Sequence, residues 1–361
     1  MTTLPLLPAA PTAAPGRAIM RDVTGGTTPG VEITFDARTA FDFVYSLDHE
    51  AGSTDDLPAA DRKWLHDERA KLPAHLRDLP QHAGAIFAAT FLVDHPEIKD
   101  AEQLAEHIGQ LPGSALAKAV LADDLRRADC QPLMHSALDG TEDAIVEVVS
   151  SWPTEKRAFL ERLLREPDLA IRDLGDLLLA WLPSYKSIEG RIDAILKRDV
   201  ELRSKDRQTL GPIELIEATT NGIRWLSEPG VRRVILAPSY FTRPFNFVFA
   251  AEDWRMFGYP VADAALDADD PLAPPAAVVR LHRALGDESR LRILRLLRDR
   301  DWYLSEIAER LSLSKPTIKH HLAQLRAAGL VTLIEEGGLS YYSLRRDRLD
   351  DASGDLKRYL I

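Results

Sequence analysis

Four polar side chains in the last quarter of the chain have the types and the spacing that suit contact with DNA. They are Lys315, Thr317, Lys319 and His320. A lysine ammonium neutralises a phosphate, and threonine and histidine form hydrogen bonds with base edges or phosphate oxygens. These residue types therefore predict a DNA-binding surface, and the surrounding elements must position it.

The element that presents them is a predicted helix from Lys315 to Ala328. Its apolar residues recur at i, i+4 and i+7 and should face a core; they are Ile318, Leu322 and Leu325. The opposite side carries Pro316, Lys319, His320 and Ala323. Cations beside small residues fit a helix lying in the major groove. His321 falls beside the apolar stripe, so we expect it to pack or to bond a phosphate.

The preceding residues predict a helix–turn–helix. Ser305 is expected to cap a short helix from Glu306 to Leu311, and Ser314 to cap the next helix. Ser312-Leu313 forms the turn between them. Apolar side chains are spaced to lock the two helices together, namely Ile307, Leu311, Leu313, Ile318 and Leu322. This arrangement is typical of DNA-binding proteins.

An earlier helix is expected to begin after Asp287, which can cap its first turn. Apolar residues at helical spacing alternate there with Arg290, Arg292, Arg295 and Arg298. Two interpretations of these arginines stay open: a solvated face, or contact with DNA phosphates.

A β-hairpin is predicted after Gly329, which should end the preceding helix. Its strands are Val331–Ile334 and Leu339–Leu344, and Glu335-Glu336-Gly337-Gly338 forms the turn. The glutamate pair would repel phosphate, and the arginines at 345, 346 and 348 could offset that repulsion. The full set of expected DNA contacts is Ser314, Lys315, Thr317, Lys319, His320, Arg326, Gly337, Gly338, Tyr342 and Arg345.

These motifs, in this order, resemble the ArsR family of bacterial winged-helix repressors. The resemblance covers about 75 residues and rests on ALGDESRLRIL (284–294), LSKPTIKHHL (313–322) and LRAAGLV (325–331). It implies a winged helix and a homodimer that binds a palindromic, double-stranded DNA operator and releases it on a signal. It also implies that Lys315, Lys319 and His320 occupy recognition-helix positions.

The chain departs from the family at its metal sites. Founding members use paired cysteines on the helix before the recognition helix, or acidic and histidine ligands on the last helix. Here residues 306–311 contain no cysteine, residues 347–361 contain no histidine, and Cys130 is the single cysteine. Thiolate coordination needs several sulfurs. We therefore expect no cysteine metal site, no bound metal and no cofactor.

Charge divides the chain into two unlike parts. The net charge is −11, yet residues 277–361 hold 16 Lys plus Arg and 12 Asp plus Glu, a balance of +4, which leaves −15 for the rest. A basic part beside an acidic one indicates nucleic-acid contact by the basic part. The one cysteine fits a reducing cytoplasm, and neither a signal peptide nor a membrane span is expected.

Four segments are predicted along the chain. Residues 1–30, rich in Pro, Ala, Thr and Gly, read as a disordered tail. Residues 31–262 form a helical sensor or dimerisation domain with a short antiparallel sheet near 231–261, and 263–275 link it to a winged helix at 276–361. The long upstream helices are expected at 153–164, 167–182, 187–202 and 213–226, and the strands at 231–236, 245–250 and 254–261. The fold is thus mainly α with small β elements.

Enzymatic chemistry is hard to find upstream, where no phosphate-binding glycine loop, metalloprotease motif or nucleophile elbow occurs. The most suggestive patch mixes aromatic and polar residues, as a small-molecule pocket does; it comprises Trp225, Tyr240, Arg243, Phe245, Asn246 and Phe247. An aromatic plug in the core is the alternative interpretation.

The sequence as a whole predicts a cytoplasmic, homodimeric DNA-binding transcriptional regulator, expected to repress, with a small-molecule effector and no membrane partner. It is not expected to be an enzyme. The alternatives are an enzyme, or a protein-interaction protein, that carries a regulatory winged helix. Apolar residues expected at a dimer interface are Val278, Val279, Leu281, Leu356, Tyr359 and Leu360.

Overall fold

The computed structural model describes residues 31–48, 51–52, 56–77, 87–125, 128–152, 154–266, 274–336 and 339–361. The predicted tail at 1–30, residues 267–273 of the expected linker and the wing tip Gly337-Gly338 lie outside these ranges. Over the described residues the chain is mainly helical and has two small sheets. The predicted fold class is confirmed, apart from the arrangement of the upstream sheet.

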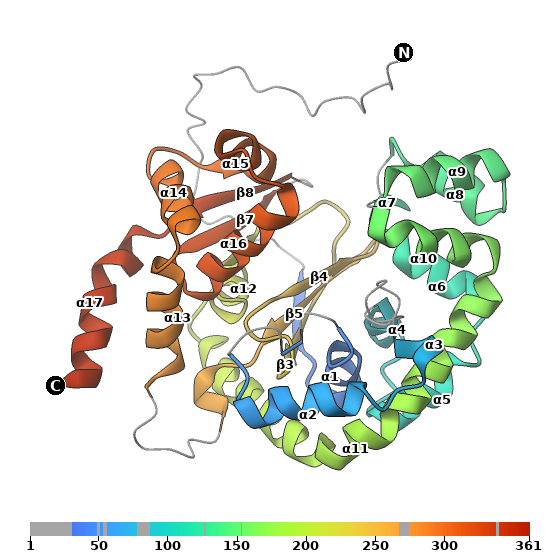
Figure 1. The fold of residues 1–361 in the computed structure, drawn as a ribbon, viewed down its shortest axis with the longest axis horizontal. Coiled ribbons are helices and arrows are strands. Elements are labelled where there is room, and N and C mark those ends of the chain that lie inside the picture. Colours follow the sequence, from blue (N-terminus) through green and yellow to red (C-terminus); the bar gives the residue numbers. More distant parts are fainter. Residues whose placement is uncertain are drawn as a thin grey trace.

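The part of the chain that precedes the winged helix is called the upstream part. A single long helix, α11 (Pro167–Asp206), supports it and runs along its edge in Figure 1. Two helices interrupted near Pro183 were expected, and that prediction is wrong. A proline removes one backbone hydrogen bond and crowds the preceding turn. The side chains on either side of it are nevertheless fixed in the core. Trp181 Nε1 donates to Ser46 Oγ at 2.8 Å, and the Tyr185 hydroxyl donates to Thr39 O at 3.2 Å. Packing therefore outweighs the local preference for a break.

Shorter helices pack around α11 and share one large apolar core with it (Figure 1). The helix α5 is capped at its start, because the Asp100 carboxylate accepts a hydrogen bond from Gln103 N at 3.0 Å. These helices are α1 (Thr39–Tyr45), α2 (Ala59–Arg69), α3 (Ala74–Arg77), α4 (Ala88–Asp94), α5 (Ala101–Ile108), α6 (Gly113–Val120), α7 (Ala122–Leu125), α8 (Gln131–Leu138), α9 (Glu142–Ser151) and α10 (Thr154–Arg165).

The upstream sheet is mixed, whereas a purely antiparallel sheet was expected. Its strands lie in the order β1 (Glu32–Phe35), β3 (Arg233–Ser239), β5 (Trp254–Pro260) and β4 (Phe247–Ala250). The first three run parallel, and only β4 is antiparallel to its neighbour. The reason lies in the connections. The strand β1 comes from far away in the chain, and the segment from β3 to β5 is long enough for the crossover that parallel pairing requires.

The C-terminal region forms a winged helix with its own apolar core. Asp287 caps α14, with its carboxylate 2.9 Å from Arg290 N, and Gly329 ends α16 with a φ of 73°; both predictions are confirmed. Its elements are α13 (Ala276–Leu285), α14 (Glu288–Leu297), β6 (Trp302–Tyr303), α15 (Leu304–Leu311), α16 (Lys315–Ala327), β7 (Val331–Glu336), β8 (Leu339–Leu344) and α17 (Arg346–Leu360).

An upstream strand joins the sheet of the wing. A helix over 213–226 was expected, but α12 (Pro212–Thr219) ends earlier and is followed by β2 (Ile223–Trp225). The chain turns at Asn221 and Gly222, whose φ values of 53° and 106° are left-handed. The strand β2 then pairs in parallel with β7, and the sheet order is β2-β7-β8-β6. The upstream part and the winged helix are therefore joined by backbone hydrogen bonds.

The turn at Gly222 generates the first testable expectation. A Cβ at this position would lie 3.0 Å from Val331 O, and its φ disfavours any side chain. Gly222→Ala should therefore lower the free energy of unfolding by about 1–3 kcal/mol. The control is Gly190→Ala, at an exposed site in α11 with open space around it, which should stabilise by about 0.5–1 kcal/mol. Urea unfolding of the two variants measures both effects, and equal stabilities would contradict the role of this turn.

Candidate nucleic-acid interface

The first two turns of α16 present the predicted DNA-binding side chains to solvent. Ser314, Lys315, Thr317, Lys319 and His320 are all exposed. Ser314 caps the helix, as predicted, since its Oγ accepts a hydrogen bond from Thr317 N at 3.2 Å. The two hydroxyls of Ser314 and Thr317 lie 2.7 Å apart. Cations at the positive end of a helix dipole create a surface suited to phosphate.

The opposite side of α16 is anchored as the sequence predicts. Ile318, Leu322 and Leu325 are fully buried in the core of the winged helix, where Ile307 and Ala308 of α15 also lie. The start of α15 differs from the prediction, because Ser305 is not its cap. Tyr303 takes that position, and the Glu306 carboxylate accepts a hydrogen bond from Tyr303 N at 2.9 Å. The strand β6 places Tyr303 there, and sequence spacing alone did not reveal it.

Arg326 corrects the expected set of DNA contacts. Its side chain is buried, with 6% of the residue exposed, and its Nη1 donates to Thr220 O at 3.1 Å. Burial lowers the pKa of Arg326 to about 10. Arg326 therefore holds the last turn of α16 against the upstream part. The sequence could not show this, because Thr220 is more than one hundred residues away.

Two of the expected wing contacts, Tyr342 and Arg345, are buried or half-buried. Tyr342 is buried in the core of the winged helix and is not placed for DNA contact. Arg345 is half-buried, and its backbone N donates to Leu330 O at 2.9 Å. Gly337 and Gly338 lie outside the described residues.

Two other basic groups near α16 take structural roles. His321 is half-buried, with its Nδ1 3.9 Å from the Asp287 carboxylate, and burial lowers the pKa of His321. Arg290 donates from Nε to Ala284 O and from Nη2 to Arg283 O, both at 2.8 Å. It thereby satisfies carbonyls at the end of α13. Capping accounts for Arg290, whereas the Nδ1 of His321 is buried and forms no hydrogen bond within the described residues.

One exposed side chain of α16, His320, lies beside a loop of the upstream part. The loop comprises residues 240–246, between β3 and β4. The ring of buried Phe245 lies 6.1 Å from the ring of His320, centroid to centroid. Figure 1 shows α16 on the side of the winged helix that is turned toward β4 and β5. One predicted base-reading side chain is thus beside the upstream part in this conformation.

The aromatic patch around this loop is mostly core. Trp225, Tyr240 and Phe245 are buried, and the ring of Phe247 stacks on Tyr45 at 5.4 Å. The Tyr240 hydroxyl donates to the Asp61 carboxylate. Both side-chain polar atoms of Asn246 are buried and lack a partner among the described residues. These contacts favour the aromatic plug, while Arg243 lines a cavity.

A buried carboxylate holds the start of the 240–246 loop. Asp42 is fully buried on α1 and accepts hydrogen bonds from Ser239 Oγ and from Tyr240 N, the latter at 2.8 Å. The Tyr185 hydroxyl lies 3.4 Å from its other oxygen. Burial raises the pKa of Asp42 to about 6, although these hydrogen bonds act in the opposite direction. The loop therefore depends on a carboxyl group whose pKa is raised by folding.

No metal-ligand group is evident in the described ranges, where no three His, Cys, Asp or Glu side chains converge. Among the same residues, no helix combines the length and the apolar character needed to cross a membrane.

Comparison with known proteins matches the winged helix. A model of the family described as "Bacterial regulatory protein, arsR family" matches residues 287–332. The HTH-type transcriptional regulator CmtR of Mycobacterium tuberculosis is 37% identical over 86 residues, which are 24% of this chain and 73% of that protein. The transcriptional repressor SdpR of Bacillus subtilis is 39% identical over 70 residues, 19% of this chain and 78% of that protein. The solved structure of HlyU from Vibrio cholerae N16961 has 32% identity and a TM-score of 0.20, covering 24% of this chain and 95% of its own.

The buried Asp42 predicts a pH dependence of stability. Its folded pKa lies above the unfolded value of 3.8, so the folded state binds more protons between pH 4 and 6. The contribution of the Asp42 carboxyl group to stability is therefore fully present below pH 4, and it falls as the pH rises through 6. Asp42→Asn should therefore gain stability over wild type on going from pH 4 to pH 7, on the order of 2–3 kcal/mol.

Urea unfolding at several pH values measures this gain. Asp139→Asn, at an exposed site after α8, corrects for the loss of one carboxylate. A difference between Asp42→Asn and wild type that stays flat from pH 4 to 7 would refute the account.

Proposed function

This chain belongs to the ArsR family of bacterial regulatory proteins, and we propose that it regulates transcription by binding a specific double-stranded DNA operator through α16. One observation carries the proposal: Lys315, Thr317, Lys319 and His320 are exposed on α16, opposite a fully buried apolar stripe. Lysines supply affinity through phosphate neutralisation, and the polar side chains supply selectivity at base edges. The acidic upstream part limits non-specific binding through charge repulsion.

The proposed direction of regulation is repression. Two matched relatives are named repressors, SdpR and the arsenical resistance operon repressor of Staphylococcus aureus, whereas HlyU is named a transcriptional activator. A bound dimer on an operator would exclude other proteins from the same DNA. A signal would then release the operator.

The upstream part is proposed to receive the signal. Its strand β2 pairs with β7 of the wing, and Thr220 accepts a hydrogen bond from Arg326 at the end of α16. A rearrangement upstream would therefore reach the DNA-binding helix through direct contacts. With Cys130 as the only thiol, we do not assign this sensing to a cysteine metal site.

A homodimer is proposed through α13 and α17, which lie together on the outer side of the winged helix (Figure 1). Two of the expected interface residues, Val278 and Leu281, are instead buried within the chain itself. The end of α17 supports the proposal better, because Leu360 is 67% exposed and Tyr359 and Ile361 are also exposed. A second copy of the chain could bury these apolar side chains at the end of the helix.

The α16 surface is tested by Lys319→Ala combined with His320→Ala. Each lost base contact should weaken operator binding by about 1–3 kcal/mol, while the fold persists because both side chains are exposed. The operator is first selected from genomic fragments at defined salt, and affinity is then measured by fluorescence anisotropy. Lys118→Ala, an exposed cation on α6, is the control. Equal affinity of the double variant and this control would refute the assignment.

The dimer is tested through the operator and the C-terminus. The selected operator should be an inverted repeat with half-site centres about 10–10.5 bp apart, or a multiple of that distance. Leu360→Glu should weaken the dimer in light scattering, because it places charge on an apolar contact. Val146→Glu, at an exposed valine of α9, is the matched control. A monomer that binds an asymmetric site one-to-one would contradict the proposed architecture.

A further inference from the structure

The loop 240–246 lies beside α16, the helix proposed to bind DNA, over two helical turns. The ring of Phe245 is 6.1 Å from the ring of His320, centroid to centroid. Further along the helix, Ala327 lines one cavity together with Pro244 of the loop, and only 7% of Ala327 is exposed. Residues seven positions apart share one face of a helix. The upstream part therefore accompanies one face of α16 from His320 to Ala327.

A helix that reads bases leaves no room for a second segment beside it. The major groove of B-DNA is about 12 Å wide, and an α-helix with its side chains is about 10–12 Å across. The helix therefore fills the groove, and the phosphate backbones run past it on both sides. A base edge bound by His320 would bring these backbones toward the position of Phe245. In this arrangement the loop and a DNA duplex compete for the space next to His320.

The loop cannot leave this space by itself, because it is fixed to the upstream part. Phe245 is 5% exposed, and its backbone N donates to Thr242 O at 2.6 Å. Tyr240 N donates to the buried Asp42 carboxylate at 2.8 Å, and buried Arg243 pairs with Asp263. Displacement of Phe245 from His320 therefore requires the upstream part to move away from α16.

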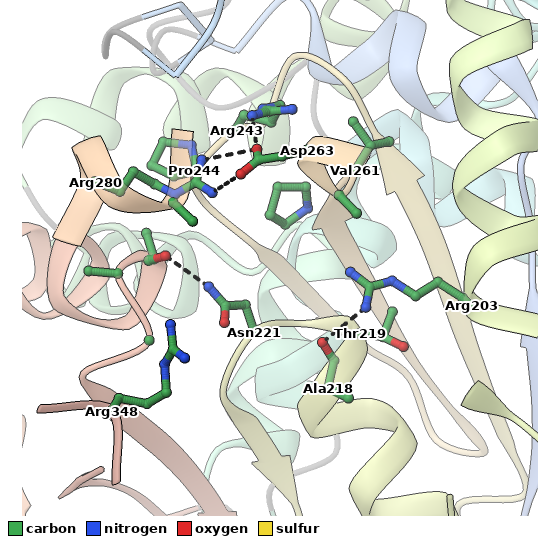
Figure 2. Close-up of a pocket in the computed structure, with 16 residues that line it drawn as sticks. Arg203, Ala218, Thr219, Asn221, Arg243, Pro244, Val261, Asp263, Arg280 and Arg348 are labelled. Atoms are coloured by element: carbon green, nitrogen blue, oxygen red, sulfur yellow. Dashed lines mark hydrogen bonds and ion pairs between the residues drawn. The ribbon is translucent and has the colours of Figure 1, made fainter. Parts of the chain in front are cut away.

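Hydrogen bonds hold the end of α16 against the upstream part. Asn221 Nδ2 donates to Ala327 O at 2.8 Å and to Arg326 O at 3.3 Å, and thus satisfies carbonyl groups of the last turn (Figure 2). The Arg326 side chain donates to Thr220 O at 3.1 Å. Water can replace such bonds at a modest net cost. The pairing of β2 with β7 spans three residue pairs and is parallel, the less stable kind per residue.

The packing at this junction is incomplete. A cavity of about 260 Å³ lies between the two parts, lined by Pro244 and Val261 of the upstream part and by Ala277 and Ala328 of the winged helix (Figure 2). Surfaces that are not closely packed gain less dispersion attraction from their contact. Their separation therefore costs less than the separation of two closely packed surfaces.

We propose that this structure is an autoinhibited state, in which the upstream part occupies space that operator DNA needs beside α16. The chain has two arrangements, this closed one and an open one in which Phe245 has left His320 and Asn221 no longer bonds the end of α16. DNA selects the open arrangement, and a signal that favours the closed one releases the operator. This regulation rests on the proposed function of α16.

Asn221→Gly tests the closed arrangement. It removes both side-chain hydrogen bonds to α16, and glycine adopts the left-handed φ of 53° freely. Because the closed arrangement is then less favoured, operator affinity in fluorescence anisotropy should rise about two-fold to ten-fold. The matched control is Gln110→Gly, which removes an amide side chain from an exposed turn after α5 and should bind as the wild type does.

A second measurement follows the movement of the two parts. Spin labels are attached through Lys118→Cys in α6 and Glu288→Cys in α14, both at exposed positions, after Cys130→Ser removes the single native thiol. Labelled chains are diluted with unlabelled ones, so that pulsed electron paramagnetic resonance reports distances within one chain. Bound operator should shift the distance between the labels, because the upstream part moves away from α16.

The two measurements separate this inference from the proposed function. An unchanged label distance on bound operator would overturn autoinhibition and leave DNA binding intact. So would an operator affinity of Asn221→Gly that does not exceed that of Gln110→Gly. If the wild type and both variants bind no selected DNA, the proposed function itself is refuted, and the inference falls with it.

Discussion

The pairing of β2 with β7 is the constraint on which the rest of this structure depends. Three residues that follow α12 run parallel to the first strand of the wing, from Ile223 beside Leu333 to Trp225 beside Glu335. Backbone hydrogen bonds close both ends, from Leu333 N to Gly222 O at 2.8 Å and from Leu226 N to Glu335 O at 2.9 Å. Backbone pairing fixes direction and register together. The winged helix is thereby held in one orientation against the upstream part.

The same junction divides α16 into two functional halves. Its first turns carry exposed cations, while its last turn is bound upstream through Arg326 and through the carbonyl of Ala327. A buried guanidinium is costly unless its donors are satisfied. Thr220 O, one acceptor for Arg326, belongs to the upstream part. Separation of the two parts would therefore change the environment of a charged group within α16, the helix proposed to bind DNA.

Charged side chains are distributed unevenly over the upstream part. The upstream part is acidic as a whole, yet it places Arg203 and Arg243 at the surface that meets the winged helix. There they lie with Arg280 and Arg348 around one cavity. Carboxylates pair with three of these arginines: Asp263 binds Arg243 and Arg280, Asp56 also binds Arg280, and Asp206 lies 3.7 Å from Arg203.

Much of the winged helix could be predicted from local sequence. The apolar stripe Ile318, Leu322 and Leu325, and the caps Asp287 and Ser314, depend on residues three to seven positions apart. Helical periodicity and capping operate over that distance. The exposed side of α16 follows from the same pattern. These features agree between the sequence and the structure.

The remaining features were decided by contacts between distant residues. Pro183 should have interrupted α11, but the helix continues through it, with Trp181 and Tyr185 buried on either side. The burial of Arg326, the parallel upstream strands and the arginine-lined cavity each join segments far apart in the chain. The sequence by itself therefore determined α16, the helix proposed to bind DNA, and the face that it exposes. Only the tertiary structure decided what that helix is bound to, because strand register and buried ion placement are set by the folded surfaces that meet and not by local spacing.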